Sequence, residues 1–198
     1  MTIVCLDLEG VLIPEMWIRV AEATEVKELR VTTREIEEYD ELMQYRLKIL
    51  AERGISLPDI QRAISDVRPL DGAIDFLKDL RSQRQVAILS DTFVEFVTGV
   101  MAQLDRPLIL CNELETDDSG MITAYRLRRP DGKRQAVEAF KSMNLKTIAA
   151  GDSFNDIAMI RSADAGVLFR PSEKVMETHP DLPVANDYAT LLSELLVT

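Results

Sequence analysis

Five short apolar runs place the strongest constraint on how this chain can fold. They lie at residues 3–6, 86–89, 108–111, 147–150 and 166–169. Each run is almost continuously apolar rather than alternating, which is typical of strands that are buried on both faces. Between the later runs, apolar residues recur at helical spacing in 73–81, 93–104, 134–143 and 155–162. Strands that alternate with helices predict an α/β fold, with a parallel sheet and helices on both of its faces.

Two segments depart from this alternation. Residues 112–127 have the pattern of a hairpin that turns at Asp118-Ser119-Gly120. Residues 14–69 contain no convincing strand, and their helical patterns lie at 15–24, 33–52 and 57–67. A direct crossover between parallel strands needs far fewer residues. The sequence therefore predicts an α/β core, residues 1–13 and 70–198, with a small helical cap, residues 14–69, inserted after the first strand.

Composition excludes several classes of partner. The 198 residues carry a formal net charge of −11, which argues against nucleic acid or an anionic membrane surface as the main partner. The N-terminus lacks a basic region, and no apolar run approaches the roughly 20 residues that span a bilayer. Cys5 and Cys111 lie inside apolar runs, so we expect two reduced, buried thiols in a cytoplasmic protein.

Acidic residues gather where the predicted strands end. Asp7 and Glu9 follow the first apolar run two residues apart, so they project to the same face, and Gly10 allows a tight turn after them. Two further runs also end in polar residues: Ser90, Asp91 and Thr92 in one case, Asp152, Asn155 and Asp156 in the other. Open α/β sheets bind ligands outside the carboxyl ends of their strands, so these residues are expected to share one edge.

Taken singly, each of these residues has an ordinary explanation. Asp7 suits a turn, Ser90-Asp91-Thr92 a helix cap, and Lys133 a solvated surface position. Crowded acids, however, repel one another unless a cation lies among them, and Mg²⁺ prefers oxygen ligands. Lys133 lies at a predicted helix start, where a cation is unfavourable unless an anion binds beside it. Their joint occurrence favours a site for Mg²⁺ and a phosphate group.

In this order, the residues resemble the four motifs of the haloacid dehalogenase superfamily of phosphotransferases. The motifs are Asp7-Leu8-Glu9-Gly10, Ser90-Asp91, Lys133 and Gly151-Asp152-Ser153-Phe154-Asn155-Asp156. The resemblance implies the Rossmann-like haloacid dehalogenase fold, and a helical cap in this position is similar to the phosphoserine phosphatase branch. Glu9 replaces the usual Asp. Together with Ser90-Asp91-Thr92, the run GDSFND at 151–156 and the lead-in LEGVLIPE at 8–15, this departure resembles the group that hydrolyses phosphoserine and also transfers its phosphoryl group to homoserine, in serine and threonine biosynthesis.

The resemblance implies a role for each acid. Asp7 would be the nucleophile and form an aspartyl-phosphate, which divides one difficult displacement into two. Mg²⁺ would be held by Asp7, Asp152 and the backbone carbonyl of Glu9. The Glu9 carboxyl would protonate the leaving serine oxygen and then activate water or an alcohol. Asp156 would hold the waters of the metal or Lys133.

The resemblance also implies binding residues for the two ends of phosphoserine. The phosphate would be bound by Ser90, Asp91, Lys133 and Asn155. Arg46 interrupts the apolar face of 33–52; such a residue commonly keeps its head in water, but here it would bind the substrate carboxylate. Glu15 would bind the substrate ammonium group. Met43 would pack on the substrate, or equally within the core.

Two alternatives remain open at this stage. The same chemistry could serve another small phosphomonoester, in which case the cap would recognise a different group. Alternatively, the chain could be a receiver-like signalling module phosphorylated on Asp7, although receivers are shorter and lack a helical insert after the first strand. The sequence does not say whether water or homoserine is the main acceptor, and it leaves the oligomeric state open, a homodimer included.

Overall fold

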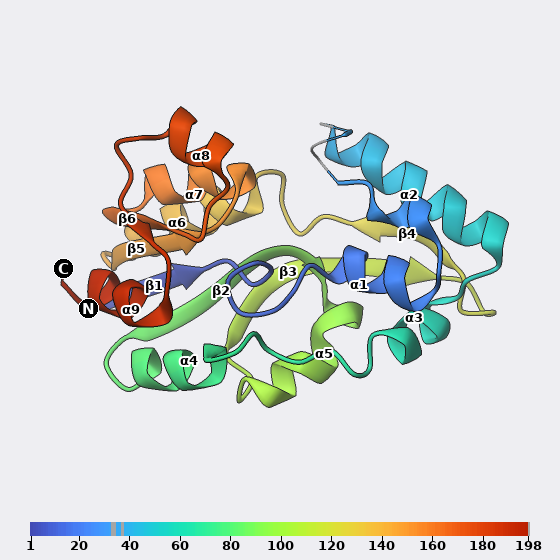
Figure 1. Cartoon of the computed structure of the whole chain (residues 1–198), viewed down its shortest axis with the longest axis horizontal. Helices are drawn as coiled ribbons and strands as arrows, with labels where there is room; N and C mark the ends of the chain where they lie inside the picture. The colour runs from blue at the N-terminus through green and yellow to red at the C-terminus, as the bar shows by residue number, and fades with distance from the viewer. Residues whose placement is uncertain (33–34, 37, 198) are drawn as a thin grey trace.

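A seven-stranded sheet forms the centre of the molecule (Figure 1). The computed structural model describes residues 1–32, 35–36 and 38–197. The strand order is β4-β3-β2-β1-β5-β6-β7, and every neighbouring pair is parallel except β3 and β4. The strands are β1 Thr2–Leu6, β2 Gln85–Phe93, β3 Leu108–Thr116, β4 Ile122–Arg126, β5 Lys146–Gly151, β6 Ala165–Phe169 and β7 Val184–Ala185. The predicted α/β class is confirmed, and so is the hairpin, which joins β3 to β4.

Helices cover both faces of this sheet (Figure 1). One face packs against α4 Ala73–Arg81, α5 Val94–Gln103 and α9 Tyr188–Leu196. The other packs against α6 Gly132–Ser142 and α7 Ile157–Ser162, with α8 Glu173–Thr178 beyond them. Residues of β1 alternate between the two cores: Val4 and Leu6 join one, Ile3 and Cys5 the other. Burial on both faces explains why β1 is apolar throughout instead of alternating.

Residues 14–69, which we call the cap segment, lie between β1 and β2, and the elements that the structure describes there are helical. Their elements are α1 Met16–Ala23, the 3₁₀ turn η1 Lys27–Arg30, α2 Tyr39–Arg53 and α3 Leu57–Ala63. The predicted helix 33–52 is observed from Tyr39 onward; residues 33, 34 and 37 lie outside the described part of the chain. A capping box at Ser56 starts α3, as its sequence indicates. The two connections to the core run side by side, since Leu70 N donates to Leu12 O at 2.9 Å.

The structure corrects the expected end of β2. The sequence suggested that this strand stops at Leu89 and that Ser90-Asp91-Thr92 opens a helix, but β2 continues through Phe93 and α5 starts at Val94. Its register with β3 shifts between Leu89 and Phe93, so the strand is irregular where the polar motif lies. The buried side chains of Thr92 and Phe93 hold the backbone extended beyond the motif.

The elements that follow β6, namely α8, β7 and α9, were not predicted. Both α8 and α9 begin at side-chain caps, because Ser172 accepts from Val175 N and Asp187 accepts from Thr190 N. These caps were the available signal. Within the described residues, no helix combines the length and apolar character needed to cross a bilayer.

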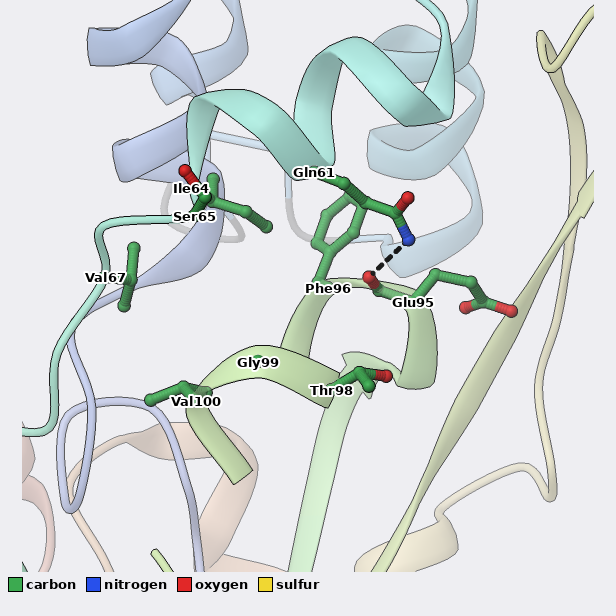
Figure 2. Close-up of a pocket in the computed structure, with 9 residues that line it drawn as sticks. All are labelled: Gln61, Ile64, Ser65, Val67, Glu95, Phe96, Thr98, Gly99 and Val100. Carbon is green, nitrogen blue, oxygen red and sulfur yellow. Dashed lines mark hydrogen bonds between the residues drawn. The ribbon is translucent and has the colours of Figure 1, made fainter. Parts of the chain in front are cut away.

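A cavity of about 210 Å³ lies between α3 of the cap segment and α5 of the core (Figure 2). One hydrogen bond crosses from helix to helix there, from Gln61 Nε2 to Glu95 O at 3.0 Å. Gly99 lies in α5 on the wall of this cavity, and a Cβ added to it would meet no atom within 4 Å. The cap segment is therefore loosely packed against α5 at this position.

We expect Gly99→Ala to stabilise the protein by about 0.5–1 kcal/mol, because alanine restricts the unfolded chain in a helix interior where space is free. The free energy of unfolding in urea measures this change. Gly166→Ala is the matched contrast: its Cβ would lie 2.5 Å from Ile160 Cγ2 and 3.0 Å from Ile160 O, so we expect a loss of stability. A destabilised Gly99→Ala variant would contradict the open space seen here.

Candidate active site

The acid-bearing loops meet at the carboxyl ends of β1, β2 and β5, at one edge of the sheet. Asp7 follows β1, and its backbone N–H donates to Ala150 O of β5 at 2.9 Å. Gly10 turns the chain beyond Asp7 with a φ of +76°, and a Cβ at this position would lie 2.5 Å from the Asp152 carboxylate. Both the backbone angle and the close approach require glycine. The first and fourth motifs are thus in direct contact.

Lys133 lies among three carboxylates. Its Nζ is 2.7 Å from Asp156 Oδ1, 2.9 Å from Asp7 Oδ1 and 3.6 Å from Asp91 Oδ2, and the side chain is 4 % exposed. Burial by itself would lower the pKa of Lys133, but the charges of Asp156, Asp7 and Asp91 outweigh it and hold this pKa well above its usual value. The ammonium group stays charged and compensates the buried acids.

Asp156 is completely buried and orients Lys133. Its Oδ2 accepts backbone N–H groups from Asp152 at 3.0 Å and Ser153 at 3.2 Å, while Oδ1 accepts from Lys133. A Cβ on Gly151 would lie 2.2 Å from Asp156 Cγ, so glycine leaves the room this carboxylate occupies. All contacts of Asp156 are internal, which fits a residue that supports the site rather than one that meets a ligand.

Asp7, Asp152 and Asp156 offer carboxylate oxygens that lie within 4.8 Å of one another. Burial and the nearby Asp156 charge raise the pKa of Asp7 well above its usual value and that of Asp152 to about 7. Because Asp156 is already paired with Lys133, the negative charge of Asp7 and Asp152 is only partly compensated. This donor set fits a divalent cation with oxygen ligands.

Glu9 lies beside the cap segment. Its Oε2 accepts the backbone N–H of Met16 at 3.0 Å, at the start of α1. Burial, followed by the charge of Glu15, raises the pKa of Glu9 to about 7, although hydrogen bonds from Met16 and Thr92 oppose the shift. A carboxyl with a pKa near neutrality can both give and take a proton at physiological pH.

The polar residues of β2 line the same edge. Ser90 is buried, and its Oγ accepts from Thr92 N at 3.3 Å. Asp91 Oδ2 accepts from Asn155 Nδ2 at 3.0 Å, in addition to its contact with Lys133. Asp91 therefore orients two potential phosphate donors, and its own carboxylate would repel a phosphate group.

Arg46 reaches the site from the cap segment with its head group buried. The residue is 5 % exposed, Nη2 donates to Val31 O at 2.8 Å, and the guanidinium carbon lies 4.5 Å from the Trp17 ring centroid. Its Nε is buried without a hydrogen-bond partner in the described structure. Met43 is fully buried beneath it, with Sδ 3.8 Å from Nη1. The solvent-exposed alternative for Arg46 is therefore wrong.

The electrostatic surroundings of Arg46 place it near Glu9 and Glu15. Burial lowers the pKa of Arg46 to about 10, while Tyr39, Glu9 and Glu15 oppose this shift. Glu15 itself is exposed and directly precedes α1. A buried cation and an exposed acid thus lie on the cap side of Glu9.

Sequence reasoning missed two residues of this site. Tyr39 donates its hydroxyl to Asp91 O at 3.1 Å, and Asn112 Nδ2 donates to the same oxygen at 3.0 Å. The available signal for Tyr39 was its spacing, four residues before Met43 and seven before Arg46, which places it on their face of the helix. No comparable signal marked Asn112, which lies in the unanticipated irregular part of the β2–β3 pairing.

Known proteins are similar to this chain in sequence and in fold. Residues 1–164 match the haloacid dehalogenase-like hydrolases. The chain belongs to this family. It is 50 % identical to the phosphoserine phosphatase ThrH of Pseudomonas aeruginosa over 196 residues, which cover 99 % of this chain and 96 % of that protein. It is also 50 % identical to a phosphoserine phosphatase of Pseudomonas syringae pv. tomato, over 98 % of this chain and 82 % of that protein.

A solved structure confirms the fold of this hydrolase. The crystal structure of a phosphoserine phosphatase in its apo form superposes with a TM-score of 0.79, covering 97 % of this chain and 98 % of that one. A phospho-aspartyl intermediate analogue of phosphoserine phosphatase gives a TM-score of 0.78. The sequence identity is 20 % in both cases, so these likenesses establish the architecture alone.

We expect Lys133→Met to destabilise the protein by about 3–5 kcal/mol at pH 7, because it leaves buried carboxylates uncompensated. Lys133 lowers the pKa of Asp7, so its removal makes Asp7 still harder to ionise. A carboxyl whose pKa rises on folding reduces the free energy of unfolding at any pH above its unfolded pKa of about 3.9. The stability lost in Lys133→Met should therefore be smaller at pH 5 than at pH 7. Urea unfolding at both pH values in EDTA measures it.

Lys141→Met provides the matched control for this variant. Lys141 lies on the same helix, is 40 % exposed and pairs with Asp164 at 3.0 Å. We expect a change below about 1 kcal/mol with little pH dependence. Equal stability of Lys133→Met and the unmodified protein at pH 7 would show that Lys133 does not compensate the acids.

Proposed function

We propose that this hydrolase is a Mg²⁺-dependent phosphoserine phosphatase that also transfers the phosphoryl group of phosphoserine to homoserine. The observation that carries the proposal is the combination of two sites. Asp7 is buried beside Lys133 and Asp152, and the cap segment carries the buried guanidinium of Arg46, which interacts electrostatically with Glu9 and Glu15. The names of the two relatives at 50 % identity support phosphoserine as the substrate.

The reaction divides into two displacements at phosphorus. In the first, a carboxylate oxygen of Asp7 bonds to phosphorus, the bond from phosphorus to the serine oxygen breaks, and Glu9 gives its proton to that oxygen. In the second, Glu9 takes a proton from water or from the hydroxyl of homoserine. That oxygen then bonds to phosphorus and the Asp7 carboxylate leaves. The pKa of Glu9, raised to about 7, suits both proton transfers.

The remaining motif residues would bind the phosphoryl group. Ser90, Lys133 and Asn155 would contact its oxygens, with Asp91 orienting the latter two. Positive and polar groups at these oxygens stabilise the charge that spreads over them during transfer. Asp7, Asp152 and the backbone carbonyl of Glu9 would hold Mg²⁺. When bound, this ion would offset the repulsion between the Asp7 carboxylate and the phosphate.

The cap segment would select the amino-acid end of the substrate. Arg46 would bind the carboxylate, Glu15 the ammonium group, and Met43 would pack beside them. The unpartnered Nε of Arg46 supports this assignment, since a buried donor is expected to find an acceptor.

We further propose that residues 14–69 act as a movable cap on the core. A cytoplasmic location is supported by the two buried, unpaired cysteines, and a homodimer is compatible with the chain.

A ³¹P NMR time course with purified protein, Mg²⁺ and phosphoserine tests the activity directly. We expect inorganic phosphate to accumulate, and a phosphohomoserine resonance to appear when homoserine is added, because the same aspartyl-phosphate serves both acceptors. Asp7→Asn should abolish both products, since the amide is a poor nucleophile. Inorganic phosphate alone would restrict the protein to hydrolysis, and turnover by Asp7→Asn would refute the mechanism.

The substrate assignment is tested by Arg46→Lys, which keeps the charge but loses the two-pronged geometry of the guanidinium. We expect its KM for phosphoserine to rise about tenfold or more, with little effect on p-nitrophenyl phosphate, which has no carboxylate. Arg53→Lys is the control on the same helix, because Arg53 is exposed and pairs with Glu28. Equal effects on both substrates would favour a different small phosphomonoester.

A further inference from the structure

The backbone carbonyl of Asp91 is held from two sides. The register shift between β2 and β3 interrupts the regular ladder at this residue. Two side chains donate to this carbonyl instead: Asn112 Nδ2 at 3.0 Å and the Tyr39 hydroxyl at 3.1 Å. Asn112 is buried, and its Oδ1 accepts from Arg128 N at 3.0 Å, so it belongs to the core. Tyr39 belongs to the cap segment.

Tyr39 shares its helix face with the proposed carboxylate-binding residue. It begins α2, and Met43 and Arg46 follow at spacings of four and seven residues, which aligns the three side chains. The Tyr39 ring packs edge-on against Tyr125 of β4, with centroids 5.9 Å apart. Burial and the charge of Asp91 raise the pKa of Tyr39, so its hydroxyl remains a donor. One helix thus contacts both the substrate end and the phosphate end of the site.

We infer that Tyr39 is a positioning residue that couples recognition of the amino-acid group to the phosphate-binding end of β2. The inference rests on the proposed function. A substrate bound by Arg46 holds α2 against the core, and the Tyr39 hydroxyl then fixes the Asp91 backbone. Ser90 precedes Asp91 directly, and the Asp91 carboxylate orients Lys133 and Asn155. A phosphomonoester without a carboxylate cannot hold α2 through Arg46, so its turnover depends less on the Tyr39 hydroxyl.

The test compares phosphoserine with p-nitrophenyl phosphate in Tyr39→Phe, in steady-state kinetics with Mg²⁺. Phenylalanine keeps the ring and removes only the donor. We expect kcat/KM for phosphoserine to fall about three- to tenfold, the effect of one neutral hydrogen bond, and mainly through kcat. The ratio of kcat/KM for phosphoserine to kcat/KM for p-nitrophenyl phosphate should fall by the same factor.

Two further variants separate this role from general packing. Tyr125→Phe removes another hydrogen bond between core and cap segment, from Tyr125 to Asp40, without touching Asp91, so the ratio should stay unchanged. Asn112→Ala removes the other donor to Asp91 O. This donor belongs to β3, so its hydrogen bond does not depend on the position of the cap segment. The variant should lower kcat/KM for both substrates by a similar factor and leave their ratio intact.

Three results would overturn the inference. In the first, Tyr39→Phe leaves the ratio unchanged while the unmodified protein hydrolyses phosphoserine, and the inference alone falls. In the second, Tyr125→Phe lowers the ratio as much as Tyr39→Phe, so that cap docking in general, and not the Asp91 contact, carries the effect. In the third, the unmodified protein hydrolyses p-nitrophenyl phosphate but not phosphoserine, and the proposed function falls together with the inference.

Discussion

The buried ammonium group of Lys133 holds together carboxylates that come from three separate parts of the chain. Asp7 follows β1, Asp91 lies in β2 and Asp156 follows β5, and each faces this one cation. Acids at such distances, of which Asp7 and Asp156 are buried, would otherwise repel one another and draw protons. Because Asp156 neutralises much of the charge of Lys133, the negative charge of Asp7 and Asp152 is only partly compensated. The site is therefore prepared for further cations while its supporting acids are satisfied.

Much of the fold follows from local patterns. Continuous apolar runs identified five strands; four of the runs are largely buried, as strands covered on both faces are, whereas Leu108 of β3 is 52 % exposed. The helices between them were found because their apolar residues repeat at the helical period. The extension of β2 through Ser90-Asp91-Thr92 was missed, because a polar triplet after an apolar run looks like a helix cap. Only its pairing with β3 and the burial of Phe93 reveal the strand.

The residues of the candidate site likewise fall into those that the sequence predicts and those that it does not. Residues in motifs could be predicted because their spacing puts acids and hydroxyls at one edge of a parallel sheet. The burial of the Arg46 head group could not, because sequence alone does not distinguish a side chain laid over a core from one inserted into it. Tyr39 and Asn112 act through a single backbone carbonyl, whose need for donors arises from a register shift in three dimensions.

The hydrogen bond from Leu70 N to Leu12 O brings the entry and exit of the cap segment to one point on the core. Because entry and exit meet, the length of the segment between them does not set the spacing of β1 and β2 in the sheet. Asp7, Lys133 and Asp152 all lie outside it, whereas Arg46 and Glu15 lie within it. Side chains that would select the substrate can thus change within one continuous segment, as long as its contacts with Glu9 and Asp91 are kept.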